Sequence, residues 1–144
     1  MRAMLIDDEP LAIVHLQKQL TACGDVDIVA SCTDIHEALT QAQDAKPDVV
    51  FIDIMMPEIT GLEAAEQLTN RLPDTRIVFV TAHDEFAIRA FELNAIDYLL
   101  KPVETSRLRK TLSRLGKRSL SRPPSAETHK SLIRCMQHLH VEGC

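Results

Sequence analysis

Side chains that could bind a cation and a phosphoryl group follow four short apolar segments of this 144-residue chain. Asp7 and Asp8 follow the first of these segments, Asp53 follows the second, and Thr81 and Lys101 follow the last two. Three carboxylates brought together repel one another unless a cation lies among them, and oxygen ligands favour Mg²⁺ or a similar hard ion. An ammonium and a hydroxyl beside them would complete a phosphoryl site, because both stabilise negative oxygens.

The elements that must position these residues are predicted from short apolar segments that alternate with longer amphipathic ones. Strands are expected at residues 2–6, 26–31, 48–52, 76–80 and 97–100, and helices at 10–23, 33–44, 60–71, 83–93 and 104–116. This order predicts an α/β fold, a doubly wound five-stranded parallel sheet with flanking helices on both faces. Ligands bind at the carboxyl ends of the strands in such sheets, so the polar residues should converge there.

Two helices have expected buried faces. In the first, Pro10 suits the first turn and Gly24 ends the helix. The apolar residues available to its buried side are Leu11, Val14, Leu16 and Leu20. In the fourth helix, the spacing of the apolar residues favours a place in the core over a partner surface. These residues are Phe86, Ile88 and Phe91.

The composition predicts a cytoplasmic protein with no membrane segment. Hydrophobic residues make up 45% of the chain, which is enough for a core at this size. No apolar run approaches the about 18 residues needed to cross a bilayer, and acidic residues follow the amino terminus too soon for a signal peptide. The four cysteines form no CxxC pair, so reduced thiols are expected.

The charge is distributed unevenly along the chain. Residues 1–103 carry 18 acidic and 7 basic side chains, whereas residues 104–144 carry 3 acidic and 9 basic ones. An acidic body does not attract nucleic acid. Because a solvated helix face and linker explain the basic end adequately, no nucleic-acid binding is expected of this chain alone.

A domain boundary is predicted after Gly116, where the amino-acid composition of the sequence changes. Residues 119–128 contain a Pro-Pro pair, three serines and little apolar material, which is typical of a linker. The segment that follows is too short to fold alone. We therefore predict one domain over residues 1–116, and a linker with a short basic tail but no folded output domain over 117–144.

Four segments of the sequence, taken in combination, resemble the signature segments of two-component response-regulator receiver domains. They are Leu5-Ile6-Asp7-Asp8-Glu9-Pro10, Phe51-Ile52-Asp53-Ile54-Met55-Met56-Pro57 with Gly61, Val80-Thr81-Ala82, and Tyr98-Leu99-Leu100-Lys101-Pro102. The resemblance covers about residues 1–116 and implies the flavodoxin-like receiver fold. The stretches 81–87 and 95–102 resemble, more narrowly, the receivers of LytTR-type transcriptional regulators.

The resemblance implies a role for each acidic residue. Asp53 would be the nucleophile that takes a phosphoryl group from a phosphohistidine on a sensor histidine kinase. Asp8 and Asp53 would bind Mg²⁺ directly, and Asp7 would act through water. The backbone carbonyl of Met55 would be a further ligand.

The resemblance also implies a switch at the ends of the last two strands. Lys101 would pair with the phosphoryl group, and Thr81 would move to form a hydrogen bond with it. Tyr98 would turn inward as Thr81 leaves room. The Lys101–Pro102 peptide bond would be cis, a form that is usually deliberate where it occurs.

Two further positions bear on how long the phosphoryl group lasts. In receivers, the residues two after the acceptor and two after the threonine flank the path of the attacking water. Here these residues are Met55 and His83. Because a thioether is a weak acceptor and orients water poorly, slow self-dephosphorylation is expected.

The output surface is expected to comprise the fourth helix, the fifth strand and the fifth helix, because the phosphoryl ligands lead into these elements. Opposite charges in this region favour a symmetric homodimer. The acidic residues are Asp84, Glu85, Glu92 and Asp97, and the basic residues are Arg107, Arg109 and Lys110.

A phosphatase and a DNA-binding transcriptional regulator are two alternative functions for a chain with these residues. A phosphatase of the haloacid dehalogenase kind would need a second aspartate two residues after the first, where this chain has Met55, so the chain is not expected to be an enzyme. A LytTR-type output domain would regulate transcription, but no strand-rich segment of that size follows Gly116. The sequence is therefore compatible with a receiver fragment, a truncated gene product or a stand-alone receiver that acts by protein contact.

A zinc site in the tail is a further alternative. Four potential ligands lie within ten residues, and their chemistry suits zinc. They are Cys135, His138, His140 and Cys144. Their spacing matches no familiar zinc finger, so this hypothesis depends on composition alone.

Overall fold

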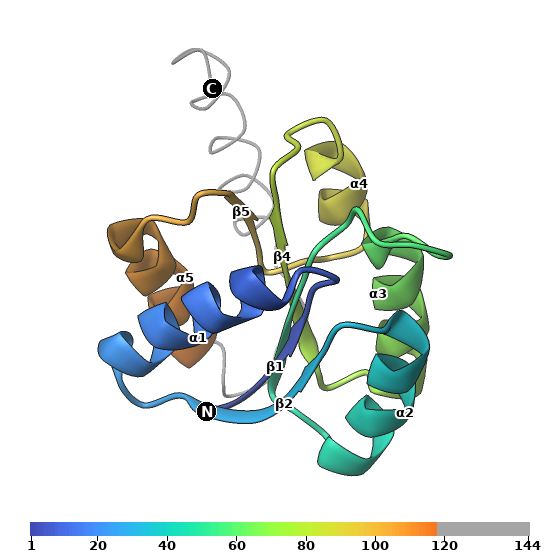
Figure 1. Ribbon diagram of the computed structural model, residues 1–144, viewed down its shortest axis with the longest axis horizontal. Coiled ribbons are helices and arrows are strands. Elements are labelled where there is room, and N and C mark those ends of the chain that lie inside the picture. Colours follow the sequence, from blue (N-terminus) through green and yellow to red (C-terminus); the bar gives the residue numbers. More distant parts are fainter. Residues whose placement is uncertain (118–144) are drawn as a thin grey trace.

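A computed structural model describes residues 1–117 and shows a five-stranded parallel sheet in the order β2-β1-β3-β4-β5 (Figure 1). The strands are β1 (Arg2–Ile6), β2 (Asp27–Cys32), β3 (Val49–Ile52), β4 (Arg76–Thr81) and β5 (Asp97–Leu100). The helices are α1 (Pro10–Cys23), α2 (Ile35–Ala45), α3 (Gly61–Arg71), α4 (Ala87–Glu92) and α5 (Thr105–Lys117). The predicted doubly wound parallel sheet is confirmed. The predicted linker and tail, with the four tail ligands, lie outside the described residues except for Lys117.

The sheet is covered on both faces. Helices α1 and α5 lie on one side, and α2, α3 and α4 lie on the other (Figure 1). Successive residues of a strand point to opposite faces, so β3 sends Val49 and Phe51 to the α1/α5 side and Val50 and Ile52 to the other. All four side chains of β3 are buried. A central strand must therefore be apolar throughout, which explains its unbroken hydrophobic run.

Local signals fix the ends of several helices. Pro10 occupies the first turn of α1, where its missing N–H leaves no bond unmade. The side chain of Asp34 accepts a hydrogen bond from the His36 N–H and caps α2. Thr60 caps α3 in the same way, with its hydroxyl 3.2 Å from the Glu63 nitrogen. In the part of the chain that the structure describes, no helix is long and apolar enough to span a membrane.

Helix α4 begins later than predicted. It starts at Ala87 rather than at residue 83 or 84, and no side chain caps it. The Tyr98 hydroxyl donates a hydrogen bond to the carbonyl of His83. Because this carbonyl bonds to a side chain from β5, the backbone around His83 is held as a loop rather than as the first turn of the helix.

Three apolar residues expected in the core are exposed instead. Leu11 and Val14 of α1 are 82% and 46% exposed, and Ile88 of α4 is 61% exposed. The buried side of α1 is formed by Ile13, Leu16 and Leu20. Leu11 precedes Ile13 by two residues, which places it about 200° away around the helix. Leu16 and Leu20 lie within about 60° of Ile13 around the helix and far from Leu11, so helical spacing itself places Ile13 on the buried side, and the expected stripe was wrong.

Asp97 is fully buried at the start of β5 and is neutralised within the chain. Its carboxylate accepts two hydrogen bonds from Arg107, at 2.6 and 2.8 Å, and one from the Thr111 hydroxyl at 2.8 Å. Arg114 lies 3.3 Å away. The expectation that Asp97 and Arg107 offer opposite charges to a second chain is therefore wrong, because each meets the other inside one chain.

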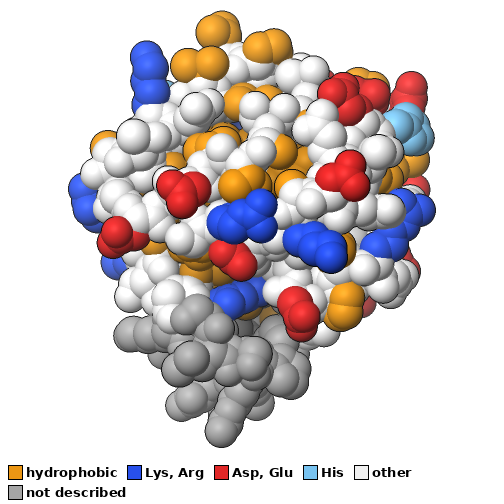
Figure 2. Space-filling model, turned by 90° about the horizontal axis from the view of Figure 1, so that it is seen from below, with side chains coloured by type: hydrophobic (Ala, Val, Ile, Leu, Met, Phe, Trp, Pro, Cys, Tyr) orange, Lys and Arg blue, Asp and Glu red, His pale blue; other side chains and the backbone are white. Residues whose placement is uncertain are grey.

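The other charged residues proposed for that surface remain exposed. They are Asp84, Glu85, Glu92, Arg109 and Lys110. Figure 2 shows a face of the molecule on which Lys and Arg side chains alternate with Asp and Glu. Within the described part of this face the charges do not form a continuous patch of one sign, which is the usual distribution on a solvated surface.

The buried Asp97 cluster generates a stability prediction. Asp97→Ala should lower the free energy of unfolding by about 3 kcal/mol, the lower end of the range for breaking a buried ion pair, because both arginines are partly exposed. Urea denaturation would measure the change. Asp84→Ala, at an exposed position of the same charge, should change it by less than about 0.5 kcal/mol. Equal losses in the two variants would contradict the assigned role of Asp97.

Candidate functional site

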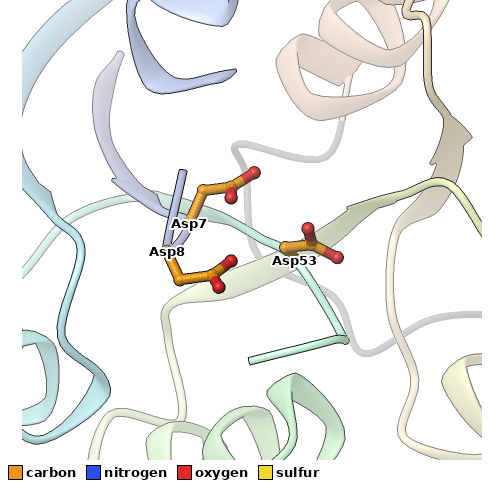
Figure 3. A group of neighbouring side chains, drawn as sticks. All are labelled: Asp7, Asp8 and Asp53. Carbon is orange, nitrogen blue, oxygen red and sulfur yellow. The ribbon is translucent and has the colours of Figure 1, made fainter. Parts of the chain in front are cut away.

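The carboxyl ends of β1 and β3 bring three aspartates together. The strands pair in register, with Ile6 opposite Ile52, so that Asp7 and Asp53 leave the sheet side by side. Asp8 follows Asp7, and the carboxyl groups of both point to the side on which Asp53 lies (Figure 3). One carboxylate oxygen from each of the three lies within 4.8 Å of the others. This spacing allows one cation to contact all three residues.

Lys101 joins this cluster from the end of β5. Its ammonium donates to Asp7 at 2.7 Å and to Asp53 at 2.8 Å. The Lys101 backbone N–H donates to the Thr81 carbonyl at 2.8 Å, which ties the ends of β5 and β4 together. The structure therefore brings together the five polar residues that the sequence singled out. The Lys101–Pro102 peptide bond is cis, as predicted.

The electrostatics of the cluster reflect both burial and pairing. Burial raises the pKa of Asp7 above its ordinary value, although hydrogen bonds from Lys101 and from the Glu9 N–H oppose this shift. Burial would lower the pKa of Lys101, but its hydrogen bonds to Asp53 and Asp7 outweigh this effect and raise it. The charged form of the lysine is therefore favoured until the pH rises above its ordinary pKa. The ammonium serves as the internal counter-ion of the carboxylates.

Thr81 has an unpaired hydroxyl. The residue is fully buried at the end of β4, and its Oγ1 atom has no hydrogen-bond partner among the described residues. A buried polar atom without a partner is unusual and marks a place where a bond partner is missing. Its backbone carbonyl contacts Lys101, so this hydroxyl belongs to the same end of the sheet as the acidic cluster.

Tyr98 lies inside the molecule. The side chain is 5% exposed and packs against Phe79, with ring centroids 6.4 Å apart. Its hydroxyl donates to the carbonyl of His83 in the loop before α4. Burial raises the pKa of the Tyr98 hydroxyl above its ordinary value, so the group remains a proton donor in this bond over the neutral range.

The loop after Asp53 is held close to the acceptor. The Met55 N–H donates to the Asp53 carboxylate at 3.2 Å, and the Met55 side chain is exposed. Gly61 packs so tightly that an added Cβ would lie 2.0 Å from the backbone oxygen of Asp53. No side chain larger than a hydrogen fits there, which explains the glycine at the start of α3.

Two contacts around the site were not found from the sequence. His36 lies 2.5 Å from Glu58 and ties α2 to the loop after β3, and Glu58 adopts a φ of 73°. Gln19 of α1 bonds to the carbonyl of Val103, in the loop after β5. Neither pair has a spacing signal, because the partners are far apart in the chain and each side chain is of an ordinary surface type.

The residues present fit a magnesium ion. Asp7, Asp8 and Asp53 offer only oxygen atoms, which are the ligands that Mg²⁺ prefers. A divalent cation would also relieve the repulsion between carboxylates that a single ammonium only partly offsets. The predicted Mg²⁺ dependence of this chain is therefore consistent with its donor set.

Comparisons with known proteins identify the family. Residues 3–113 match the family described as the response regulator receiver domain. An uncharacterised response regulatory protein of Vibrio vulnificus is 49% identical over 80% of this chain and 47% of its own length. The transcriptional regulatory protein BtsR of Escherichia coli is 41% identical over 97% of this chain and 60% of its own length.

A solved structure has the same fold. The response regulatory domain of mrkE from Klebsiella pneumoniae matches with a TM-score of 0.78 and 34% identity, over 85% of this chain and 100% of that one. The chain spans 47% and 60% of the two curated relatives named above. Since the family match covers most of the chain and agrees with the observed fold, this chain belongs to the response regulator receiver domain family.

Proposed function

We propose that this chain is the phosphoacceptor of a two-component signal transduction system and takes a phosphoryl group from a sensor histidine kinase onto Asp53. The observation that carries the proposal is the bond from the Lys101 ammonium to the Asp53 carboxylate at 2.8 Å, beside two further acidic groups. The three functions expected of a phosphoryl site are present together: a nucleophile, a fixed positive charge and a set of cation ligands. The chain acts as a substrate and switch rather than as an enzyme with turnover.

The transfer step follows from the positions of the side chains. A carboxylate oxygen of Asp53 attacks the phosphorus of the phosphohistidine as the phosphorus–nitrogen bond breaks. The electron pair of that bond leaves with the imidazole, which departs as the neutral ring because its other nitrogen already carries a proton or because it takes up one proton from solvent. Lys101 is placed to stabilise the oxygens of the transferred group, and the Thr81 hydroxyl is available to donate to one of them.

The metal would be held by the acidic cluster. Asp8 and Asp53 would bind Mg²⁺ directly, with the carbonyl of Met55 as a further ligand and Asp7 acting through water. Bound Mg²⁺ would neutralise charge on the phosphoryl oxygens and on the carboxylates. The Lys101 ammonium would then leave Asp7 and Asp53 and pair with the phosphoryl group instead.

A switch is built from Thr81 and Tyr98. If the Thr81 hydroxyl moves to the phosphoryl group, the packing beside it changes on the side of Tyr98. The bond from Tyr98 to the His83 carbonyl extends this change to the loop before α4. Phosphorylation can shift the equilibrium between the two states only by the difference in the free energy with which the phosphoryl group interacts with each of them. The switch therefore depends on a hydrogen bond from Thr81 to the phosphoryl group that forms in one state and not in the other.

The output is proposed to be transcriptional. BtsR carries the name of a transcriptional regulatory protein, and this chain covers 60% of its length. The proposal of a LytTR-type output domain rests on the resemblance of residues 81–87 and 95–102 to the receivers of such regulators. The alternative is a stand-alone cytoplasmic receiver that acts by protein contact. A homodimer through α4, β5 and α5 remains a prediction, but only the exposed charges of that surface, without Asp97 and Arg107, are available to it.

The first test concerns the acceptor. Incubation with Mg²⁺ and a small phosphodonor should add one phosphoryl group, because Asp53 is the one nucleophile proposed for the acidic cluster and its carboxylate bonds to Lys101. Asp53→Asn should abolish the mass increase measured by intact-protein mass spectrometry. Asp74→Asn, at an exposed site far from the cluster in sequence, is the matched control and should be phosphorylated normally. Labelling that persists in Asp53→Asn would refute the assignment.

The second test concerns the metal. Mg²⁺ at 100 times its dissociation constant should raise the free energy of unfolding by about 2.7 kcal/mol, since it binds the folded chain alone. Asp8→Asn should lose most of this gain, whereas Asp7→Asn should keep more of it if Asp7 acts through water. Thermal unfolding with and without Mg²⁺ measures the effect. An unchanged gain in Asp8→Asn would rule out the proposed ligand set.

The third test concerns the lifetime of the phosphoryl group. Met55→Asn should speed self-dephosphorylation by about three- to tenfold, the rate equivalent of one added hydrogen bond to the attacking water. The Met55 side chain is exposed, so the substitution should not disturb packing. Decay of the phosphorylated protein after removal of the donor gives the rate. Identical decay rates for the two proteins would remove Met55 from the explanation.

A further inference from the structure

Gln19 connects α1 to the loop that carries Lys101. Its side-chain Nε2 donates to the backbone carbonyl of Val103 at 2.7 Å, and Thr105 Oγ1 lies 3.4 Å from the same nitrogen. Val103 is buried, and Thr105 is the first residue of α5. This amide therefore connects α1 to a loop residue 84 positions later in the chain. That residue, Val103, follows Lys101 by two positions.

The loop after β5, to which Gln19 bonds, is not closely packed against α1. A cavity of about 150 Å³ lies between α1 and this loop, and its lining includes Gln19, Asp53, Lys101, Pro102 and Val103. Atoms that border a cavity lack dispersion contacts on that side and move more easily than atoms in a close-packed core. The position of the loop consequently depends more on its polar bonds than the position of a packed loop would.

The orientation of the Gln19 amide is fixed by its partner. A reversed amide would place Oε1 against the Val103 carbonyl, and neither oxygen could donate. In the observed orientation Oε1 is buried and has no hydrogen-bond partner among residues 1–117. Leaving a buried oxygen unpaired costs stability, so an apolar side chain of similar size would serve the packing equally well. The hydrogen bond to the Val103 carbonyl therefore explains an amide at this position better than packing in the core does.

We propose that Gln19 is a positioning residue for the phosphoryl-transfer site: it holds the loop after β5 so that the Lys101 ammonium reaches Asp7 and Asp53 together. The proposal rests on the phosphoacceptor function proposed above. Gln19 touches neither the acceptor nor the metal ligands, and it acts only through the loop. Without it, the ammonium is free to withdraw from the carboxylates.

Mg²⁺ affinity provides a test that needs no phosphorylation. Lys101 competes with the cation for Asp7 and Asp53, because both positive charges are attracted to the same two carboxylates. Gln19→Leu should therefore bind Mg²⁺ more tightly, by about two- to tenfold, the range of couplings between contacting groups. Isothermal titration calorimetry measures the dissociation constant. Gln17→Leu, at an exposed position of the same helix, should leave it unchanged.

A double-mutant comparison separates positioning from a general structural effect. In a Lys101→Ala background, Gln19→Leu should have no further effect on Mg²⁺ affinity, since the side chain that Gln19 positions is gone. Urea denaturation should show that Gln19→Leu still unfolds in one cooperative transition, with some loss of stability because the Val103 carbonyl loses its donor. Gln19→Met, which also lacks the donor and adds no charge, gives a second route if the leucine variant folds poorly. The same Mg²⁺ affinity in Gln19→Leu and the native chain, or an equal effect in both backgrounds, would overturn the proposal.

Phosphorylation by a small phosphodonor then links the residue to transfer. At saturating Mg²⁺, the maximal rate of Gln19→Leu should fall by about three- to tenfold, because Lys101 no longer stabilises the transferred group fully. An unchanged rate would contradict the positioning role. If the native chain itself accepts no phosphoryl group, the proposed function fails, while the Mg²⁺ measurements still decide whether Gln19 positions Lys101.

Discussion

The ammonium of Lys101 is the charge on which this end of the molecule depends. Three carboxylates share a small volume at the ends of β1 and β3, and in the absence of a cation they destabilise the fold by mutual repulsion. Lys101, which follows the edge strand β5, bonds to two of them. In the proposed function the same charge would pair with an incoming phosphoryl group. The ammonium would then act both as the counter-ion of the carboxylates and as the group that stabilises the product.

This arrangement requires a parallel sheet with a particular strand order. Because β1 and β3 are neighbours, Asp7 and Asp53 emerge side by side. Strand β4 lies between β3 and β5, so that Thr81 ends the strand between those that lead to Asp53 and Lys101. Two backbone bonds at these ends, from Asp53 N–H to the Ile6 carbonyl and from Lys101 N–H to the Thr81 carbonyl, keep the strands aligned up to the site. The chemistry is thus a consequence of topology, and a change of strand order would separate the same residues.

The sequence predicted the sheet and the convergence of the five polar residues, because each has a strong local signal: a buried strand or a polar residue at its end. The cis peptide at Pro102 was implied by the resemblance to receiver domains. In α1 the wrong stripe was expected in the core, since Ile13 shares a helical face with Leu16 and Leu20 whereas Leu11 lies on the opposite face. The sequence failed where the outcome depends on a distant partner. Asp97 looked like a surface charge, because its ion pair with Arg107 is formed by the packing of α5. The roles of the site residues remain predictions.

The two helices that flank β5 differ in how firmly they are held. Helix α5 is fixed to the strand by the buried Asp97, which accepts bonds from two arginines, a threonine and the backbone N–H of Tyr98. Helix α4 has only six residues and no side-chain cap. Short helices without caps and with few buried side chains open at lower free-energy cost than well-anchored ones. Tyr98 therefore lies between α5, which is firmly anchored, and α4, which is weakly anchored. Its hydroxyl bonds to the loop before α4. In the proposed switch a small displacement at Thr81 would meet least resistance on the α4 side, so the fold would direct the change toward α4.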